Sequence, residues 1–476
     1  MATKITVIGA GPGGYVAAIR AAQLGAEVTV IEQDNVGGTC VNYGCIPSKI
    51  MKSAAEVLQN FYRAHEFGIR VNGEAFPDMQ RLMARKQEII EIQTKGILKL
   101  LDNHKIRYLR GYGYIKGNGM AGVKRRGKTL EVPWNRLILA SGSQPLNIPL
   151  FPFNAKKILS SNDALDLHEI PESMMIVGGG AIGSEFAFIF ASLGSKVTVV
   201  EAMSRILPLP SVDKDCSKVI QREMKKRKIE FKINSTVKKI EEDREKVRVT
   251  IGPSHFGQQQ KESGSKPFTI ETNKLLVCIG RKPNTSNIGL KQLGVKMDEK
   301  GWIDANERME TSVSDVYAIG DVLGPSRAML AHVASTEGLT AAENAMGGSR
   351  VMNYRVVPGA IFTMPEVANV GLTEAQAREQ GYTARSDSVL FRNIGKPHVI
   401  GEIAGQIKMV SDAKNGRILG IHIVGPHATD LIAEGTLAVK LGATVKELSE
   451  TIHAHPTLSE VMLEASLKAL DRSLHG

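Results

Sequence analysis

One arrangement of apolar and small residues occurs twice along the chain. In the first copy, an apolar run over residues 5–8 leads through a glycine-rich turn into a small-residue helix predicted over 15–24. A second apolar run over 27–31 follows and ends at Glu32. Short buried strands that alternate with helices indicate parallel sheets, so the pattern predicts an α/β fold with two Rossmann-like dinucleotide-binding domains. The second copy occupies residues 174–177, 184–193 and 196–200 and ends at Glu201.

The rest of the chain has a mixed pattern. A long helix is predicted over residues 85–103, and short strands and turns over 110–150. Residues 241–274 predict a hairpin whose polar tip covers 253–266. Residues 280–350 predict a strand that ends in Gly-Asp and an alanine-rich helix. The last stretch alternates strands with amphipathic helices, which is typical of an α+β interface (dimerisation) domain.

The composition is that of an ordinary globular protein, with 42% hydrophobic and 23% charged residues among 476. No apolar run approaches the roughly 18 residues of a membrane span, so no membrane association is predicted. The net charge of +11 includes basic runs at 124–128 and 225–228. Neither run is interleaved with aromatic residues, so we predict solvated surface rather than a nucleic-acid site. The basic field would instead attract an acidic protein partner.

Two cysteines five positions apart, Cys40 and Cys45, follow the first nucleotide unit. Zinc sites usually space their ligands more closely and in two pairs, and Cys216 and Cys278 stand far away. A reversible disulfide fits better. On one ideal helix the two Cα atoms would lie about 8–9 Å apart, beyond the reach of an unstrained disulfide, which predicts a strained and reducible bond. The low cysteine content also predicts a reducing, cytoplasmic compartment.

Both glycine-rich turns have the features of a nucleotide site. Each follows a strand, opens a helix and has an acidic residue 23 positions after its first glycine. Backbone N–H groups at the helix N-terminus can bind a pyrophosphate, and the acid can accept hydrogen bonds from a ribose. A packing turn without a ligand is the alternative for each. The residues are Gly9, Gly11, Gly14 and Glu32 in the first copy, and Gly178, Gly180, Gly183 and Glu201 in the second.

Two nucleotide sites beside a dithiol predict two cofactors. A dithiol and a nicotinamide exchange electrons poorly without a mediator, and a flavin is the usual one. The first site is assigned to FAD because the cysteine pair lies on the same unit. The second is assigned to NAD, since the carboxylate of Glu201 would repel the 2′-phosphate of NADP. Asp321 can hold the ribityl hydroxyls of the flavin, although Gly-Asp alone is more often a simple turn.

The C-terminal segment around His455 has three interpretations. Thr457 and Glu460 form the sequence of a capping box that would start the last helix. His453 and His455 have the spacing of a metal site but no further ligands nearby, and no metal is predicted. His455 oriented by Glu460 would be a general base, which dithiol chemistry near neutral pH requires.

Taken in order, these segments resemble the pyridine nucleotide-disulfide oxidoreductases over essentially the whole chain. The resemblance implies that Cys40 attacks the substrate and that Cys45 is the thiolate in contact with the flavin. It also implies that Lys49 pairs with Glu185 beside the flavin and nicotinamide rings. The segments that carry it are 37–49, 178–185, 279–284, 318–321, 329–332, 363–366 and 453–460.

The same resemblance implies a homodimer in which His455, held by Glu460, acts across the subunit interface. It divides the chain into an FAD-binding domain (1–150 and 280–350), an NAD-binding domain (151–279) and an interface domain (351–476). The further positions that match FAD contacts are Thr39, Lys49, Gly113, Ser141, Gly142, Asp321 and Ala331. Those that match positions near NAD are Ile182, Val237, Gly280 and Arg281.

The implied activity is the oxidation of dihydrolipoyl groups carried by lipoyl domains or other lipoyl-carrying proteins, with NAD as acceptor. A glutathione-reductase-like enzyme is one alternative, but it would show arginines after Glu201, where this chain has Ala-Met-Ser. A redox-silent scaffold that binds flavin and NAD is another, but it would not keep both cysteines and the His–Glu pair. Tyr43 departs from the family pattern because it is bulkier than the residue usually found between the cysteines, and it would alter access to the disulfide.

Overall fold

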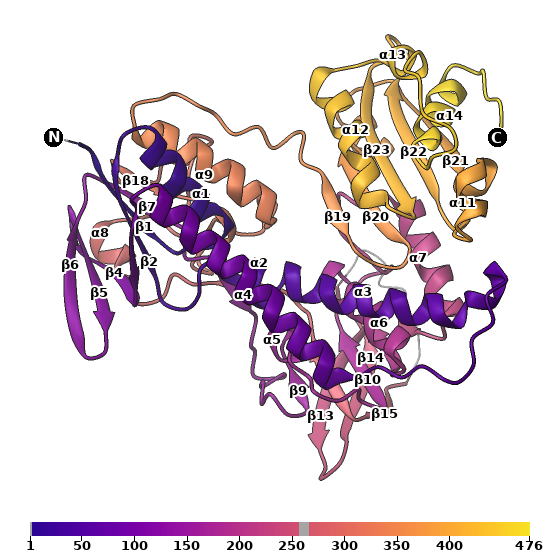
Figure 1. Cartoon of the computed structure of the whole chain (residues 1–476), viewed down its shortest axis with the longest axis horizontal. Helices are drawn as coiled ribbons and strands as arrows, with labels where there is room; N and C mark the ends of the chain where they lie inside the picture. The colour runs from indigo at the N-terminus through magenta and orange to yellow at the C-terminus, as the bar shows by residue number, and fades with distance from the viewer. Residues whose placement is uncertain (1, 257–265) are drawn as a thin grey trace. The chain divides into compact units, whose positions relative to one another are not determined.

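The computed structural model describes residues 2–256 and 266–476, which form two compact units (Figure 1). Unit 1 contains residues 1–51, 80–146 and 280–354, and unit 2 contains residues 52–79, 147–279 and 355–476. Most of the predicted polar tip, residues 257–265, lies outside the described residues. The four-segment division of the chain into domains stays a prediction.

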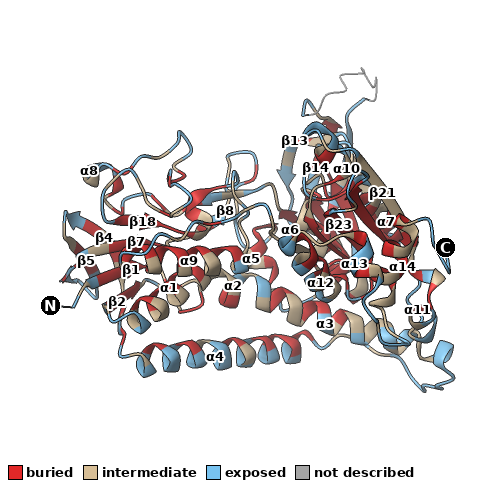
Figure 2. Cartoon of the chain, turned by 90° about the horizontal axis from the view of Figure 1, so that it is seen from above, coloured by how far each residue is buried: buried red, intermediate tan, exposed pale blue. Residues whose placement is uncertain are grey.

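Unit 1 is built on a five-stranded parallel sheet. The central strand β1 (Lys4–Ile8) is buried at all but its first residue, and its neighbours β2 (Glu27–Glu32) and β7 (Arg136–Leu139) are also mostly buried, as Figure 2 shows in red. Helix α1 (Pro12–Gln23) packs on α9 (Ala331–Ala345) through glycines, since a Cβ at Gly338 would lie 2.5 Å from the carbonyl oxygen of Gly13. The strand order is β18 (Val316–Ala318), β7 (Arg136–Leu139), β1 (Lys4–Ile8), β2 (Glu27–Glu32) and β3 (Arg107–Arg110).

Unit 2 repeats four strands of this sheet in the same order, but its fifth strand, β9 (Ile158–Leu159), precedes the other four in the chain, whereas β18 follows the other four in unit 1. Its central strand β10 (Ser173–Val177) pairs in parallel with β11 (Lys196–Val200) and β16 (Lys274–Val277), as β1 pairs with β2 and β7. Helix α6 (Ala181–Leu193) follows the second glycine turn. Both predicted Rossmann-like domains are therefore present. The strand order is β12 (Glu230–Lys232), β11 (Lys196–Val200), β10 (Ser173–Val177), β16 (Lys274–Val277) and β9 (Ile158–Leu159).

Both helices begin earlier than the pattern predicted, at Pro12 rather than residue 15 and at Ala181 rather than residue 184. The glycine before each is the N-cap, so the helix starts inside the turn, and Pro12 suits a first helical turn that needs no N–H donor. The predicted long helix is α4 (Met79–Asn103), which starts six residues early. Its buried residues recur every three or four positions, which produces the alternating colours of α4 in Figure 2.

Each unit also contains a three-stranded antiparallel sheet. The predicted hairpin over 241–274 is correct for β14 and β15, but a third strand, β13, begins upstream and pairs with β14. Val237, Val249 and Ile251 of this sheet pack into a core with strands of the parallel sheet of unit 2. The strands are β4 (Tyr112–Gly117), β5 (Met120–Arg125) and β6 (Lys128–Pro133) in unit 1, and β13 (Ser235–Glu242), β14 (Val247–Pro253) and β15 (Phe268–Thr272) in unit 2.

The C-terminal part of unit 2 has the predicted α+β architecture. An antiparallel sheet buries Ile407 and Ile421, together with Phe391 of the following 3-10 turn, against the helices α12 (Ala428–Leu441) and α14 (Glu460–Ala469). The strand order is β19 (Gly359–Ile361), β20 (Glu366–Gly371), β23 (Ile418–Gly425), β22 (Gln406–Asp412) and β21 (Ala384–Leu390). None of the helices in the described part of the chain is long and apolar enough to span a bilayer.

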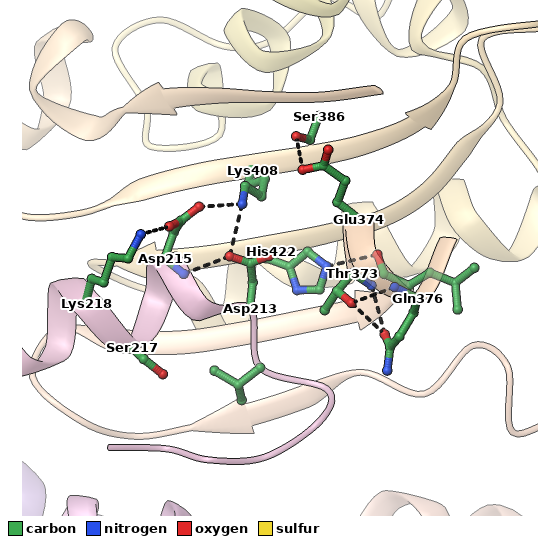
Figure 3. Close-up of polar contacts among 12 residues, drawn as sticks. Asp213, Asp215, Ser217, Lys218, Thr373, Glu374, Gln376, Ser386, Lys408 and His422 are labelled. Atoms are coloured by element: carbon green, nitrogen blue, oxygen red, sulfur yellow. Dashed lines mark hydrogen bonds and ion pairs between the residues drawn. The ribbon is translucent and has the colours of Figure 1, made fainter. Parts of the chain in front are cut away.

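A buried ionic cluster joins this sheet to helix α7 (Lys214–Lys226) within unit 2 (Figure 3). Lys408 of β22, only 6% exposed, lies with Nζ 3.1 Å from Oδ1 of Asp213 and also contacts Asp215. Asp213 is the N-cap of α7 and accepts a hydrogen bond from the amide of Asp215. Hydrogen bonds from Lys408 and Lys218 outweigh burial and lower the pKa of Asp215 to about 2. The cluster therefore consists of paired charges.

Candidate functional site

Cys40 and Cys45 lie on two different helices. Helix α2 (Gly38–Tyr43) ends at Gly44, and α3 (Cys45–Tyr62) starts at the next residue. The assumption of one continuous helix was therefore wrong, because the break at Gly44 brings the two side chains together. Both are thiols here, hydrogen-bonded to each other, with Cys45 exposed and Cys40 partly buried. The hydrogen bond to Cys45, and then burial, raise the pKa of Cys40 above its ordinary value.

A buried asparagine that the sequence interpretation missed holds helix α2 in place. Asn42 lies between the cysteines and is 8% exposed. Its side-chain amide donates hydrogen bonds to the carbonyl oxygens of Val36, at 3.1 Å, and Gly38, at 2.9 Å. The loop that enters α2 is thereby tied to the helix that carries Cys40. A buried polar residue inside the cysteine motif could have revealed this role.

Lys49 lies in unit 1 and Glu185 lies in unit 2, and each has contacts within its own unit. Lys49 lies one turn after Cys45 on α3, and its Nζ is 3.4 Å from Oγ of Ser48. The positive charge of Lys49 opposes the rise in the pKa of Cys40. Glu185 lies on α6 in unit 2 and accepts a hydrogen bond of 2.9 Å from the amide of Phe362. The pairing of Lys49 with Glu185 stays a prediction.

The first glycine turn has the geometry of a pyrophosphate site. Gly9 has a positive φ of 106°, and a Cβ there would lie 2.1 Å from the carbonyl oxygen of Ala140. A Cβ at Gly14 would lie 1.9 Å from the carbonyl oxygen of Gly9, so both positions require glycine. Gly11 is the N-cap of α1, whose first N–H groups face the end of the turn. An anionic ligand fits this position.

Glu32 is bound to its own glycine turn. One carboxylate oxygen accepts the amide of Ala10 at 2.7 Å, and the other accepts the amide of Asp34 at 2.9 Å. Burial raises the pKa of Glu32, although both amides oppose this effect. Each carboxylate oxygen has a second lone pair, which a ribose hydroxyl can use.

A cavity of about 240 Å³ opens beside these residues in unit 1. Ser141, at the end of β7, lines it and has a buried hydroxyl with no hydrogen-bond partner among the described residues. Gly113 of β4 also lines it, and a Cβ there would lie 2.9 Å from Cγ2 of Ile31. An orphaned hydroxyl beside a polar cavity is what a bound polar cofactor would satisfy, so the residues present fit FAD. The other predicted contacts in this unit are Thr39 on α2, Gly142 with a φ of 71°, and Ala331 at the start of α9.

Asp321 lies three residues after β18, in the 3-10 turn Gly320–Leu323 at the carboxyl edge of the sheet, where nucleotides bind in such folds. Its Oδ2 accepts a hydrogen bond of 2.5 Å from Oγ of Ser143 and lies 3.6 Å from Nε of Arg281. Arg281 was predicted near NAD, and the structure places it against this carboxylate in unit 1. Gly280, its neighbour, has a φ of 133°. The prediction missed Ser143, since its contacts are distant in sequence.

The second glycine turn reproduces the first. A Cβ at Gly178 would lie 2.4 Å from the carbonyl oxygen of Cys278, and one at Gly183 would lie 1.9 Å from that of Gly178. Glu201, 5% exposed, accepts the amides of Gly179 at 2.6 Å and Met203 at 2.7 Å. These bonds match those of Glu32, and a second dinucleotide fits this turn.

Three further positions in unit 2 complete the comparison with the predicted NAD contacts. Ile182, in the first turn of α6, is 39% exposed, which leaves apolar surface for a ligand. Val237 is buried in the core of unit 2, so its side chain packs inward. Gly180 is the N-cap of α6, and no atom lies within 4 Å of its ideal Cβ.

His455 and Glu460 are brought together as predicted. Nδ1 of His455 lies 2.8 Å from Oε1 of Glu460, and the imidazole is 76% exposed while the carboxylate is 19% exposed. Burial would raise the pKa of Glu460, but hydrogen bonds from His455 and the Thr457 amide outweigh it, and the pKa is lowered. The capping box is only half formed. Thr457 donates its amide to Glu460, but its hydroxyl bonds Ala454 instead, and α14 starts at Glu460.

Comparisons with known proteins agree with this geometry. Residues 3–338 match the family model described as pyridine nucleotide-disulphide oxidoreductase, and residues 357–466 match the dimerisation domain of the same family. The chain belongs to this family, and the predicted fold class is confirmed. The matched dimerisation domain supports a homodimer.

The particular relatives are dihydrolipoyl dehydrogenases. The enzyme of Chlamydia muridarum is 42% identical over 98% of this chain and 97% of its own length. That of Thermus scotoductus is 39% identical over 99% and 98%. The solved structure of LpdA from Mycobacterium tuberculosis superposes with a TM-score of 0.88 at 27% identity, covering 98% of this chain and 99% of that one. Dihydrolipoyl dehydrogenases are oxidoreductases that use FAD and NAD, so the predicted enzyme class and cofactors are confirmed.

Proposed function

We propose that this protein oxidises dihydrolipoyl groups carried by partner proteins and reduces NAD, with Cys40 and Cys45 as its redox-active pair. The observation that carries the proposal is the contact between the two thiols across the break at Gly44. The separation expected for a single helix does not apply, because the two cysteines lie on different helices and their side chains are hydrogen-bonded to each other. The names of the full-length relatives supply the substrate class.

The proposed reaction begins with the disulfide form of the pair. A substrate thiolate attacks Sγ of Cys40, the bond between the cysteines breaks, and Cys45 leaves as a thiolate. His455 accepts the proton of the second substrate thiol, whose sulfur then attacks the first and releases Cys40. The substrate ends as a cyclic disulfide, and the electron pair resides on the two cysteines. FAD, when bound, passes such a pair to NAD⁺.

The chain's own residues account for the acid–base steps. Because a carboxylate can only accept, Nδ1 of His455 donates to Glu460, and Nε2 keeps a free lone pair for a proton. The anionic Glu460 then stabilises the imidazolium that forms. We further propose that His455 acts on the cysteine pair of the other subunit of a homodimer. An acidic lipoyl-carrying partner fits the net charge of +11, and the low cysteine content supports a cytoplasmic compartment.

Steady-state turnover of the purified protein tests this function directly. Dihydrolipoamide, glutathione disulfide and mercuric ion are each supplied with NAD or NADP cofactors, and Cys45→Ser protein is the matched control. We expect NAD-dependent oxidation of dihydrolipoamide that the control lacks. Faster turnover of glutathione disulfide with NADPH would instead support a glutathione-reductase-like enzyme. Bound flavin without turnover of any substrate would support a redox-silent scaffold.

A further inference from the structure

The buried carboxylate of Glu337 contacts the residue before Asp321, and no role has been given to Glu337 so far. Glu337 of α9 is 1% exposed. Its Oε2 accepts the amide of Gly320 at 2.6 Å, and its Oε1 accepts the hydroxyl of Tyr354 at 2.5 Å. Gly320 directly precedes Asp321 and has a φ of 73°, a left-handed conformation that suits glycine. The acid therefore holds the turn that presents Asp321.

The carboxylate is the end of a chain of hydrogen bonds that starts at an arginine. Nη1 of Arg327 donates to the hydroxyl oxygen of Tyr354 at 2.9 Å, and the Tyr354 proton points to Glu337. The guanidinium also stacks on the Tyr354 ring, 5.1 Å from its centroid. Arg327 is anchored in turn by the carbonyl oxygens of Ala305 and Asn306. The positive charge of Arg327 thus stabilises the buried carboxylate of Glu337 through the hydroxyl group of Tyr354.

The contacts of Asp321 come from two sides. Its side chain is held by Ser143 and Arg281, whereas the amide of the preceding residue is held by Glu337. Burying a carboxylate carries a large desolvation cost, and a neutral acceptor would satisfy a single amide at a smaller one. A charged acceptor gives a shorter and stronger bond, which restricts the turn more tightly. This arrangement suits a turn that has to place a ligand group rather than merely pack.

We propose that Glu337, supported by Tyr354 and Arg327, is a positioning residue for FAD that acts through Asp321 by fixing the Gly320–Asp321 turn. The inference rests on the proposed function only in taking FAD as the ligand of unit 1. Burial raises the pKa of Glu337, while the bonds from Tyr354 and Gly320 and the charge of Arg327 oppose this effect. Loss of the network should therefore weaken cofactor binding without removing any direct contact with the cofactor.

The test is a double-mutant cycle read out by FAD affinity. Apoprotein is prepared from the holoenzyme and titrated with FAD for wild type, Glu337→Gln, Asp321→Asn and the double variant. Glu337→Gln should raise the Kd about tenfold to a hundredfold, the range expected for loss of a hydrogen bond to a charged group. In the Asp321→Asn background the same change should have less than about a third of that effect, because the two residues act together. Visible circular dichroism of the bound flavin should change in Glu337→Gln.

Two further variants keep the outcome decisive. Tyr354→Phe retains the ring and Glu337 but removes the hydroxyl, so an intermediate rise in Kd is expected if Glu337→Gln does not fold. Thr336→Ala on the same helix removes only a bond to His332 within α9 and should leave the Kd unchanged. Additive effects of Glu337→Gln and Asp321→Asn, or an unchanged Kd in Glu337→Gln and Tyr354→Phe, would overturn the proposal. A wild-type chain that binds no FAD would instead count against the proposed function.

Discussion

Nδ1 of His455 lies 2.8 Å from Oε1 of Glu460, while three quarters of the imidazole remains exposed. The second oxygen of Glu460 accepts the amide of Thr457 at 2.9 Å, so the carboxylate is fixed from two directions. The imidazole is therefore oriented on one side and exposed on the other. The first two predictions follow from this pair.

Replacing His455 by glutamine should lower dithiol oxidation by about 10²- to 10⁴-fold, the usual cost of a lost general base. Glutamine can still donate to Glu460, so the local structure should persist. Stopped-flow measurement of the reductive step with dihydrolipoamide gives the rate. Flavin content and NADH-driven reduction of a one-electron dye should be largely spared, and loss of these as well would contradict the assignment.

A site shared between subunits predicts complementation. His455→Gln and Cys45→Ser proteins should each be inactive as homodimers. After subunit exchange, one of the two sites in a heterodimer regains both groups, so activity should return. Exchange is checked by mass spectrometry of the intact dimers. Verified heterodimers without activity would show that His455 does not serve the partner subunit.

Cys40→Ser should leave Cys45 as an isolated thiol on the flavin-binding unit. In the intact pair, the hydrogen bond to Cys45 and burial raise the pKa of Cys40, which disfavours a thiolate at Cys40. We expect the variant with FAD bound to absorb at long wavelength at mildly alkaline pH without added reductant, because a thiolate in contact with an oxidised flavin donates charge to it. Cys45→Ser is the matched control and should lack the band. A long-wavelength band in Cys45→Ser but not in Cys40→Ser would mean that Cys40, not Cys45, is the cysteine in contact with the flavin.

The nicotinamide preference should favour NAD by at least about a hundredfold in kcat/KM, which corresponds to roughly 2.7 kcal/mol. Glu201 is almost fully buried and held by the amides of Gly179 and Met203, so its carboxylate cannot swing away from a 2′-phosphate. Steady-state kinetics with both nucleotides measure the ratio. Equal kcat/KM values for NAD and NADP would show that Glu201 does not determine the coenzyme preference.

A pH effect on stability is expected from His422 of β23. Its side chain is fully buried, Nε2 donates to the carbonyl oxygen of Leu372 at 3.0 Å, and Nδ1 has no hydrogen-bond partner within the described ranges (Figure 3). Burial lowers the pKa of His422, and among its neighbours the charge of Asp213 opposes this while that of Lys408 adds to it. The folded state therefore resists protonation at a pH where the unfolded chain accepts it.

The sign follows from linkage. Above the unfolded pKa of about 6.5, His422 is neutral in both states and does not lower the free energy of unfolding. Below that value the unfolded chain takes up a proton first, so the free energy of unfolding falls by up to about 1.4 kcal/mol per pH unit until the lowered folded pKa is reached. His422→Gln keeps a donor for Leu372 and does not titrate. Urea unfolding of both proteins between pH 5 and 7 should therefore show the wild type losing its advantage as the pH falls. A constant difference would mean that His422 does not titrate in this range.

The local pattern of the sequence was enough to predict the two nucleotide folds. The spacing from Gly9 to Glu32 and from Gly178 to Glu201 follows from one strand, one turn and one helix, so short-range periodicity determines it. The third strand β13 was missed because its exposed lysines and glutamates hide the alternation. The break between Cys40 and Cys45 was missed because a single glycine inside a motif is a weak signal.

Contacts between distant residues could not be predicted from the pattern. Ser143, Arg281 and Asp321 come from three separate segments, and so do Glu337, Tyr354 and Arg327. Nothing in the spacing of these residues indicates that their polar atoms meet. The sheet topology brings the first three together, and the loops on either side of α9 bring Arg327 and Tyr354 to Glu337. The His455–Glu460 pair could be predicted because only five positions separate the two residues.

The binding of each acid to its own glycine turn limits how the coenzyme preference could be redesigned. Exchanging Glu201 for a small residue would remove the acceptor of two main-chain amides, at Gly179 and Met203, in a place with almost no access to water. The turn would lose its shape before a phosphate could use the space. A change of preference therefore has to transplant the segment from the end of β11 to α7 as one cassette, with its own donors and acceptors already matched.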